Sequence, residues 1–243
     1  MTAQNARVVN AELLTPSELD AAIDASPIAY LPLGSLEFHG PHLPIGLDAL
    51  NAHGVCLGAA GRTGGVVLPP LYQGLGGGHS DYPWTMMMRT PDGIRSHLEQ
   101  TLGRLQHFGV HLAVIFTGHF ADEQLAMIDG IAADWNAAPN GLRVLATSVN
   151  RSTAPITPDH AGVFEATLLS GLEPGLVHLD RLPDPLDFPD PGGDSMGVER
   201  HDPNHPLWGI FGPDPRAADL TRGHELLESL VGWLSSEVAL ERP

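Results

Sequence analysis

Four short runs of apolar residues are separated along the chain by longer segments of mixed character. The runs cover residues 28–33, 65–68, 111–116 and 142–146. Most positions within each run are apolar, which is typical of strands that are covered on both faces. We therefore expect these runs to form a central, mainly parallel sheet.

The segments between these runs have apolar residues at helical spacing. Residues 49–60 are small and apolar, and apolar positions recur every three or four residues in 94–108 and in 125–135. A further apolar stripe over 220–238 indicates core or subunit packing. Strands that alternate with helices predict an α/β protein, a three-layer α/β/α sandwich with a mainly parallel central sheet.

Residues 180–215 break this pattern. They are rich in Pro, Gly and Asp and show no hydrophobic period. A loop of this length in a compact domain is usually functional or poorly ordered. We interpret it as a lid or a subunit-contact arm, with disorder as the alternative, within a single domain that covers residues 1–243.

The charge and the cysteine content restrict the classes of partner. The chain has 29 acidic residues against 12 basic ones, all arginine, and a formal net charge of −17. A protein this acidic is a poor partner for nucleic acid or anionic membrane. A single cysteine, Cys56, excludes an internal disulfide framework. No apolar run has membrane-spanning length and no secretion signal is recognisable, so we expect a cytoplasmic protein.

Residues suited to metal binding follow the first apolar run. Glu37 and His39 are two positions apart, so on an extended segment their side chains point the same way. Turn residues then lead to Asp48, which we expect at the N-cap of the next helix. Converging carboxylates repel unless a cation lies between them, which favours a divalent metal site. The alternative is a helix cap beside a surface pair.

Two later clusters carry residues of the same types. His119 follows the third apolar run and can share a sheet edge with Glu37, although alone it would be interpreted as structural. His160 and Glu165 flank the start of a predicted helix. His160 suits a general acid or base, and Glu165 suits a metal ligand or an orienting partner. The alternative is that Asp159 caps this helix while those side chains are solvated.

A glycine-rich segment covers residues 74–85. Because it lacks the lysine and the spacing of a P-loop, phosphate binding is not favoured, and we expect its aromatic residues to line a pocket. No dinucleotide-binding fingerprint follows any predicted strand, which excludes a nucleotide-binding α/β protein.

Together these segments resemble the creatininase family of metal-dependent amidohydrolases. The longest match is Gly-Ser-x-Glu-x-His-Gly-Pro-His-Leu-Pro at 34–44, followed by Asp48. Shorter matches to family motifs stand at 79–85, 117–122, 160–167 and 209–215. The resemblance covers nearly the whole chain.

The resemblance implies a site for two divalent ions, Zn, Mn or Fe, and often a hexamer. The ligands correspond here to Glu37, His39, His119 and a bridging Asp48. In creatininase itself the last ligand lies two residues after the histidine of the Gly-His motif, where this chain has Ala121. Glu165 is the natural replacement, and His160 matches the catalytic histidine.

Several pocket positions depart from the family pattern. Phe38 replaces the usual Gln, Trp84 replaces the usual Gly, and both Asn of the Gly-His motif are changed. We expect the substrate pocket to be formed by Phe38, His79, Tyr82, Trp84 and Asp122. These changes disfavour creatinine itself as the substrate, whereas the metal ligands are retained.

The sequence therefore predicts a hydrolase in which a metal-activated water cleaves a carbonyl-adjacent bond, an amide C–N bond, of a small cyclic substrate. One alternative is a C–C bond hydrolase that opens a cyclic 1,3-diketone such as an oxidised inositol. A second is a non-catalytic metal-binding scaffold, which the presence of Glu37 and His160 disfavours. We expect a small-molecule substrate, a homo-oligomer, and no nucleic-acid or membrane partner.

Overall fold

A parallel sheet forms the centre of the molecule. The structure, a computed structural model, describes residues 10–139 and 141–241. The strand order is β2-β1-β6-β7. β3 pairs with the carboxyl-terminal end of β1, and all these pairings are parallel. The strands are β1 (Ile28–Gly34), β2 (Val66–Val67), β3 (Leu71–Tyr72), β6 (Leu112–Thr117) and β7 (Arg143–Ser148). A separate short pair joins β4 (Gly74–Leu75) and β5 (Met87–Met88).

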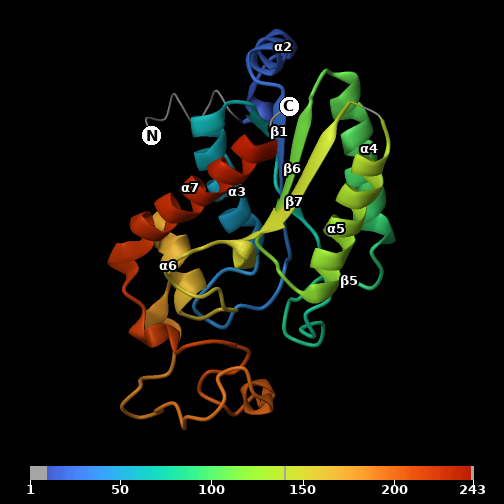
Figure 1. Ribbon diagram of the computed structural model, residues 1–243. Helices are drawn as coiled ribbons and strands as arrows, with labels where there is room; N and C mark the ends of the chain where they lie inside the picture. The colour runs from blue at the N-terminus through green and yellow to red at the C-terminus, as the bar shows by residue number, and fades with distance from the viewer. Residues whose placement is uncertain (1–9, 140, 242–243) are drawn as a thin grey trace.

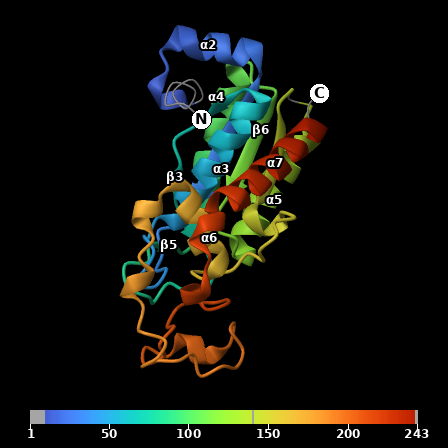
Figure 2. The ribbon, with the colours of Figure 1, turned by 90° about the vertical axis from the view of Figure 1, so that its left-hand side faces the viewer.

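Helices cover both faces of this sheet (Figure 1). One face packs against α3 (Leu47–Thr63), α6 (Val163–Leu172) and α7 (Gly223–Glu241), and the other against α4 (Asp92–His107) and α5 (Asp122–Ala137). The helix α2 (Pro16–Ala25) lies at one end of the molecule, and the loop after α6 lies at the other (Figure 2). This arrangement confirms the predicted three-layer α/β/α sandwich.

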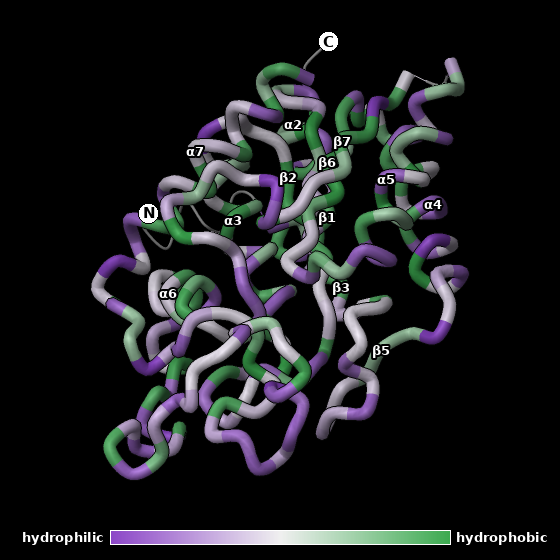
Figure 3. The backbone as a smooth tube through the Cα atoms, turned by 60° about the horizontal axis from the view of Figure 1, so that its bottom comes forward, coloured by the Kyte–Doolittle hydropathy of each residue, from purple (hydrophilic) through white to green (hydrophobic). Residues whose placement is uncertain are grey.

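The alternating side chains of the strands explain why both faces need cover. Tyr30 and Phe116 pack on the α3 and α7 side, whereas Leu31 and Ile115 pack on the α4 and α5 side. Every residue of β1 is buried. In Figure 3 the tube around the central strands is mostly coloured as hydrophobic. Strands of this kind are stable only between two helical layers.

Two expectations about helices are refined. The helix α3 begins at Leu47 with Gly46 as its N-cap, so the prediction that Asp48 is the N-cap was wrong. Asp48 instead lies in the first turn of the helix. The C-terminal stripe lies in α7, where Leu226, Leu230 and Leu234 pack into the core against α3. That stripe therefore serves the core of this chain.

Residues 180–215 form an irregular segment, and its buried Leu182, Leu207 and Ile210 share an apolar cluster with Leu43, Leu47 and Leu169 of the rest of the fold. Arg200 is buried, and its guanidinium donates to the Ile210 carbonyl and pairs with Asp190. The short 3₁₀ turns are η1 (Ala11–Leu13), η2 (Val149–Arg151), η3 (Pro174–Leu176), η4 (Leu179–Arg181), η5 (Val198–His201), η6 (Pro215–Ala217) and η7 (Leu220–Arg222). Among the described residues, no helix has the length and apolar character needed to cross a membrane.

Candidate metal centre

The predicted ligands meet at the carboxyl edge of the sheet. Glu37 and His39 follow β1, His119 follows β6, and Asp48 comes from the first turn of α3. The start of α3 packs so closely on both strand ends that a Cβ on Gly118 would lie 2.1 Å from the Asp48 carbonyl oxygen. Parallel strands commonly place functional residues at this edge.

His39 is held in one tautomer by the main chain. Its Nδ1 donates to the Glu37 carbonyl oxygen at 3.0 Å, so Nδ1 carries a proton and Nε2 is the nitrogen that can bind either a proton or a metal ion. Nε2 lies 3.2 Å from Asp48 Oδ1 and 3.5 Å from Glu165 Oε2. The ring is fully buried, and Nε2 makes no hydrogen bond of normal geometry. A buried ring nitrogen that faces two carboxylates can bind either a proton or a metal ion, so Nε2 is suited to act as a metal ligand.

His119 is held in the opposite tautomer. Its Nε2 donates to the Leu75 carbonyl oxygen at 3.2 Å. Its Nδ1 therefore faces the carboxylates, 2.8 Å from Glu37 Oε1 and 3.4 Å from Asp48 Oδ2. Both imidazoles thus direct toward acidic side chains the nitrogen that can bind either a proton or a metal ion.

Main-chain and hydroxyl donors position the three carboxylates. Ser35 Oγ lies 2.9 Å from Glu37 Oε1 and 2.7 Å from Asp48 Oδ2, and Oε2 of Glu165 accepts from the Ala161 N–H at 2.6 Å. All three carboxylates are buried, with exposed fractions of 1–2%. Buried carboxylates this close together require compensating positive charge.

The five side chains form two overlapping groups that could each hold a cation. One group is Glu37, Asp48 and His119, and the other is His39, Asp48 and Glu165. Within each group the ligand atoms lie within 4.8 Å of one another. Asp48 belongs to both, and the nitrogen and oxygen donors suit Zn, Mn or Fe. The residues therefore fit a pair of divalent ions.

The electrostatics of the protein alone point the same way. Burial favours neutral His39, yet the carboxylates of Asp48 and Glu165 outweigh it and raise the pKa of His39 to about 10. Burial likewise opposes ionisation of Asp48, but positive charge on His39 lowers the pKa of Asp48 to about 2. Protons on the imidazoles thus balance the carboxylates, and a cation would displace these protons on binding.

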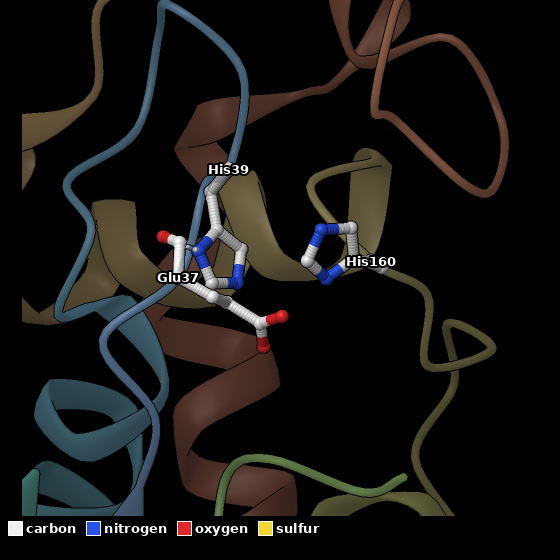
Figure 4. A group of neighbouring side chains, drawn as sticks. All are labelled: Glu37, His39 and His160. Carbon is white, nitrogen blue, oxygen red and sulfur yellow. Dashed lines mark hydrogen bonds between the residues drawn. The ribbon is translucent and has the colours of Figure 1, made fainter. Parts of the chain in front are cut away.

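His160 adjoins this group from another element. Its ring centroid lies 4.5 Å from that of His39 and 4.3 Å from that of His79. In Figure 4 the carboxylate of Glu37 points into the space between His39 and His160. Nε2 of His160 donates to the Phe38 carbonyl at 3.0 Å, which leaves Nδ1 to exchange a proton. Burial lowers the pKa of His160 to about 3, so the ring is neutral in the protein without metal.

A cavity of about 400 Å³ opens onto these groups. Its lining includes both carboxylates of the first group, His119, His160 and Glu165. Of the residues predicted for the pocket, His79 and Asp122 line it. Phe38 and Tyr82 are not among the lining residues and stack on each other instead, with centroids 5.6 Å apart.

Trp84 is not among the residues that line this cavity. Its side chain is 77% exposed and its φ is +60°, a left-handed conformation that favours glycine. The irregular segment contributes lining residues that the sequence analysis did not single out for the pocket, namely Met196, His201 and Phe211. Only the family resemblance at 209–215 pointed toward Phe211. No local pattern marks Met196 or His201, because tertiary packing alone brings them over the site.

Comparison with known proteins identifies the family of this chain. The family model for creatininase, described as creatinine amidohydrolase, matches residues 12–238. Creatinine amidohydrolase of Pseudomonas putida is 29% identical over 204 residues, which cover 72% of this chain and 77% of that protein. A deformylase of a formylaminopyrimidine 5'-monophosphate from Methanothermobacter thermautotrophicus is 32% identical over 164 residues, 65% of this chain and 64% of that protein.

Solved structures extend the likeness to the whole fold. A crystal structure of creatininase superposes with a TM-score of 0.78 at 26% identity and covers 97% of this chain and 98% of its own. Two further creatininase structures, at 24% identity, share the fold and are described as Mn and as Zn–Zn type. This chain belongs to the creatininase family of hydrolases.

Proposed function

We propose that this protein is a metal-dependent hydrolase that cleaves an amide C–N bond of a small cyclic substrate. Glu37, Asp48 and His119 would hold one divalent ion, and His39, Asp48 and Glu165 the other. The observation that carries this proposal is the buried Nε2 of His39, which faces the carboxylates of Asp48 and Glu165 and has no hydrogen bond of normal geometry.

The ions, when bound, supply Lewis acidity that lowers the pKa of a water molecule and polarises a carbonyl group. The residues of the chain supply orientation and proton transfer. The Phe38 carbonyl holds His160 by its Nε2 proton, so Nδ1 can take a proton from the attacking water. His160 then returns that proton to the leaving nitrogen, because an amine leaves more readily than an amide anion.

The cavity limits the size of the substrate. A volume of about 400 Å³ accommodates a small molecule. Phe211, Phe120 and Met196 add apolar surface beside the carboxylates and histidines that line the cavity. The two relatives are named as an amidohydrolase and as a deformylase of a formylamino group. Those names favour an amide bond over the carbon–carbon bond of a cyclic 1,3-diketone.

Metal removal combined with a substrate panel tests the proposal. We expect chelated protein to lose turnover and to regain it with Mn²⁺ or Zn²⁺. The panel contains creatinine, other cyclic amides, formamides and a cyclic 1,3-diketone. Turnover that survives complete metal removal contradicts the proposal, and turnover of the diketone alone assigns the C–C reaction. Metal binding without turnover of any compound favours a scaffold.

A matched pair of variants localises the effect. Glu165→Gln removes a proposed ligand, so we expect it to lose bound metal and activity. Glu173→Gln makes the same chemical change at an exposed position just after the same helix and is expected to behave as wild type. Equal behaviour of the two variants would remove Glu165 from the proposed site.

A further inference from the structure

His42 is a buried histidine that the proposed reaction does not use. It follows His39 by three positions and has no exposed surface. Its Nε2 donates to the carbonyl oxygen of Ala161 at 3.1 Å, across 119 positions of sequence. The hydrogen bond therefore joins the segment of His39 to the segment that carries His160 and Glu165.

Ala161 occupies an unusual backbone position between those two residues. Its φ is +58°, in the left-handed region that side chains other than glycine rarely adopt, and the residue is fully buried. Its N–H donates to Glu165 Oε2 at 2.6 Å. Because the surroundings must hold such a conformation in place, the partners of Ala161 determine where its N–H points.

His42 can hold this turn with a single hydrogen bond, from its Nε2 to the Ala161 carbonyl. Burial lowers the pKa of His42 to about 4, so the ring is neutral and carries a single N–H. That N–H is on Nε2, since a carbonyl can only accept, and Nδ1 is buried without a hydrogen bond. Gly40 gives the ring its room, because a Cβ there would lie 2.7 Å from His42 Nδ1.

We propose that His42 is a positioning residue for Glu165. By donating to the Ala161 carbonyl, it holds the left-handed turn whose N–H aims the Glu165 carboxylate at His39 and Asp48. This inference rests on the proposed two-ion site. His42 therefore supports the ion position formed by His39, Asp48 and Glu165. The position formed by Glu37, Asp48 and His119 does not depend on it.

Two substitutions separate the hydrogen bond from the shape of the ring. His42→Phe keeps a planar ring and removes the donor, whereas His42→Gln keeps an N–H donor where Nε2 stands. Chelated wild type and both variants are titrated with Zn²⁺ by calorimetry. For His42→Phe we expect one equivalent to bind as in wild type and the second to weaken about 10–100-fold, as for other outer-shell partners of ligands. His42→Gln should bind both equivalents nearly as wild type does.

The other results are equally informative. If wild type binds no second equivalent, the two-ion site itself fails, and the inference fails with it. If wild type binds two and His42→Phe also binds two with unchanged affinities, only the role of His42 is wrong. Equal weakening of both equivalents, or of both variants, indicates a general effect on folding and overturns the proposal. Thermal unfolding of the metal-free proteins identifies a variant that does not fold.

If His42→Phe yields no folded protein, His42→Gln decides through its crystal structure with zinc. We expect the introduced side-chain amide to lie within hydrogen-bonding distance of the Ala161 carbonyl, with both metal positions occupied. An intact hydrogen bond beside an empty Glu165 position overturns the proposal, and so does full occupancy with the hydrogen bond absent.

Discussion

At the scale of single residues, the main chain selects which nitrogen each histidine offers. His39 donates through Nδ1 to a carbonyl two residues away, whereas His119 donates through Nε2 to the Leu75 carbonyl, 44 residues away. The motif spacing was enough to predict that these residue types serve as ligands. It could not predict the tautomer of His119, because its partner Leu75 belongs to β4, which meets His119 only in the folded protein.

His160 provides a test of proton transfer at this scale. His160→Gln retains an N–H for the Phe38 carbonyl and removes the titratable ring. We expect kcat to fall by about 10²–10⁴-fold, the usual contribution of a general acid or base, with metal content unchanged. Steady-state kinetics and elemental analysis measure the two quantities. A rate within a few-fold of wild type would show that another group moves the proton, and loss of an ion would place His160 among the ligands.

Trp84 provides a test of backbone strain. Its left-handed φ of +60° is unfavourable for a bulky residue, and its exposed side chain loses little packing on removal. Trp84→Asn should raise the free energy of unfolding by about 1 kcal/mol, since Asn tolerates this conformation. Trp84→Ala keeps the strain and should change stability little. Urea denaturation compares them, and equal effects of Asn and Ala would mean that strain is not the cause.

At the scale of elements, the close packing of α3 on the ends of β1 and β6 builds the site. Gly34 and Gly118 make it possible, since a Cβ on Gly34 would lie 2.3 Å from the Ala49 nitrogen. The Asp48 side chain is therefore directed inward from the first turn of α3. The sequence predicted strand, turn and helix in this order, but the contact between α3 and the end of β6 depends on how the sheet is assembled.

Gly118→Ala tests this contact. The added methyl group would meet the Asp48 carbonyl, so we expect a loss of about 1–3 kcal/mol in stability, as for other overpacked sites, together with weaker metal binding. Gly103→Ala is the control, because a Cβ at this position in α4 meets no atom within 4 Å. It should stabilise the protein by about 0.5–1 kcal/mol. Similar effects from both substitutions would argue against the packing explanation.

At the scale of the whole molecule, the candidate metal centre links stability to pH. The pKa of His39 is raised from 6.5 to about 10 in the folded protein without metal. The stabilisation from its charged form is complete below about pH 6.5 and is lost as the pH rises toward 10. We expect the free energy of unfolding of chelated protein to decline across this interval. Urea denaturation at several pH values measures it.

Metal-loaded protein is the control for that experiment. Because a cation replaces the proton on His39, the decline between pH 6.5 and 10 should largely disappear when Zn²⁺ is bound. A metal-free protein whose stability stays constant or increases over this range would contradict the charge balance inferred for the site.

The order of residues along the chain was sufficient to predict the parallel strands, the helices between them and the residue types that gather at the candidate metal centre. Apolar periodicity and motif spacing are local properties, and local contacts fix secondary structure within a few residues. Folding in three dimensions was needed to place Asp48 inside the helix, to bring Met196 and His201 over the cavity and to join His42 to Ala161. These contacts connect segments far apart in sequence, so they arise only when the layers pack and each buried polar group must find a partner.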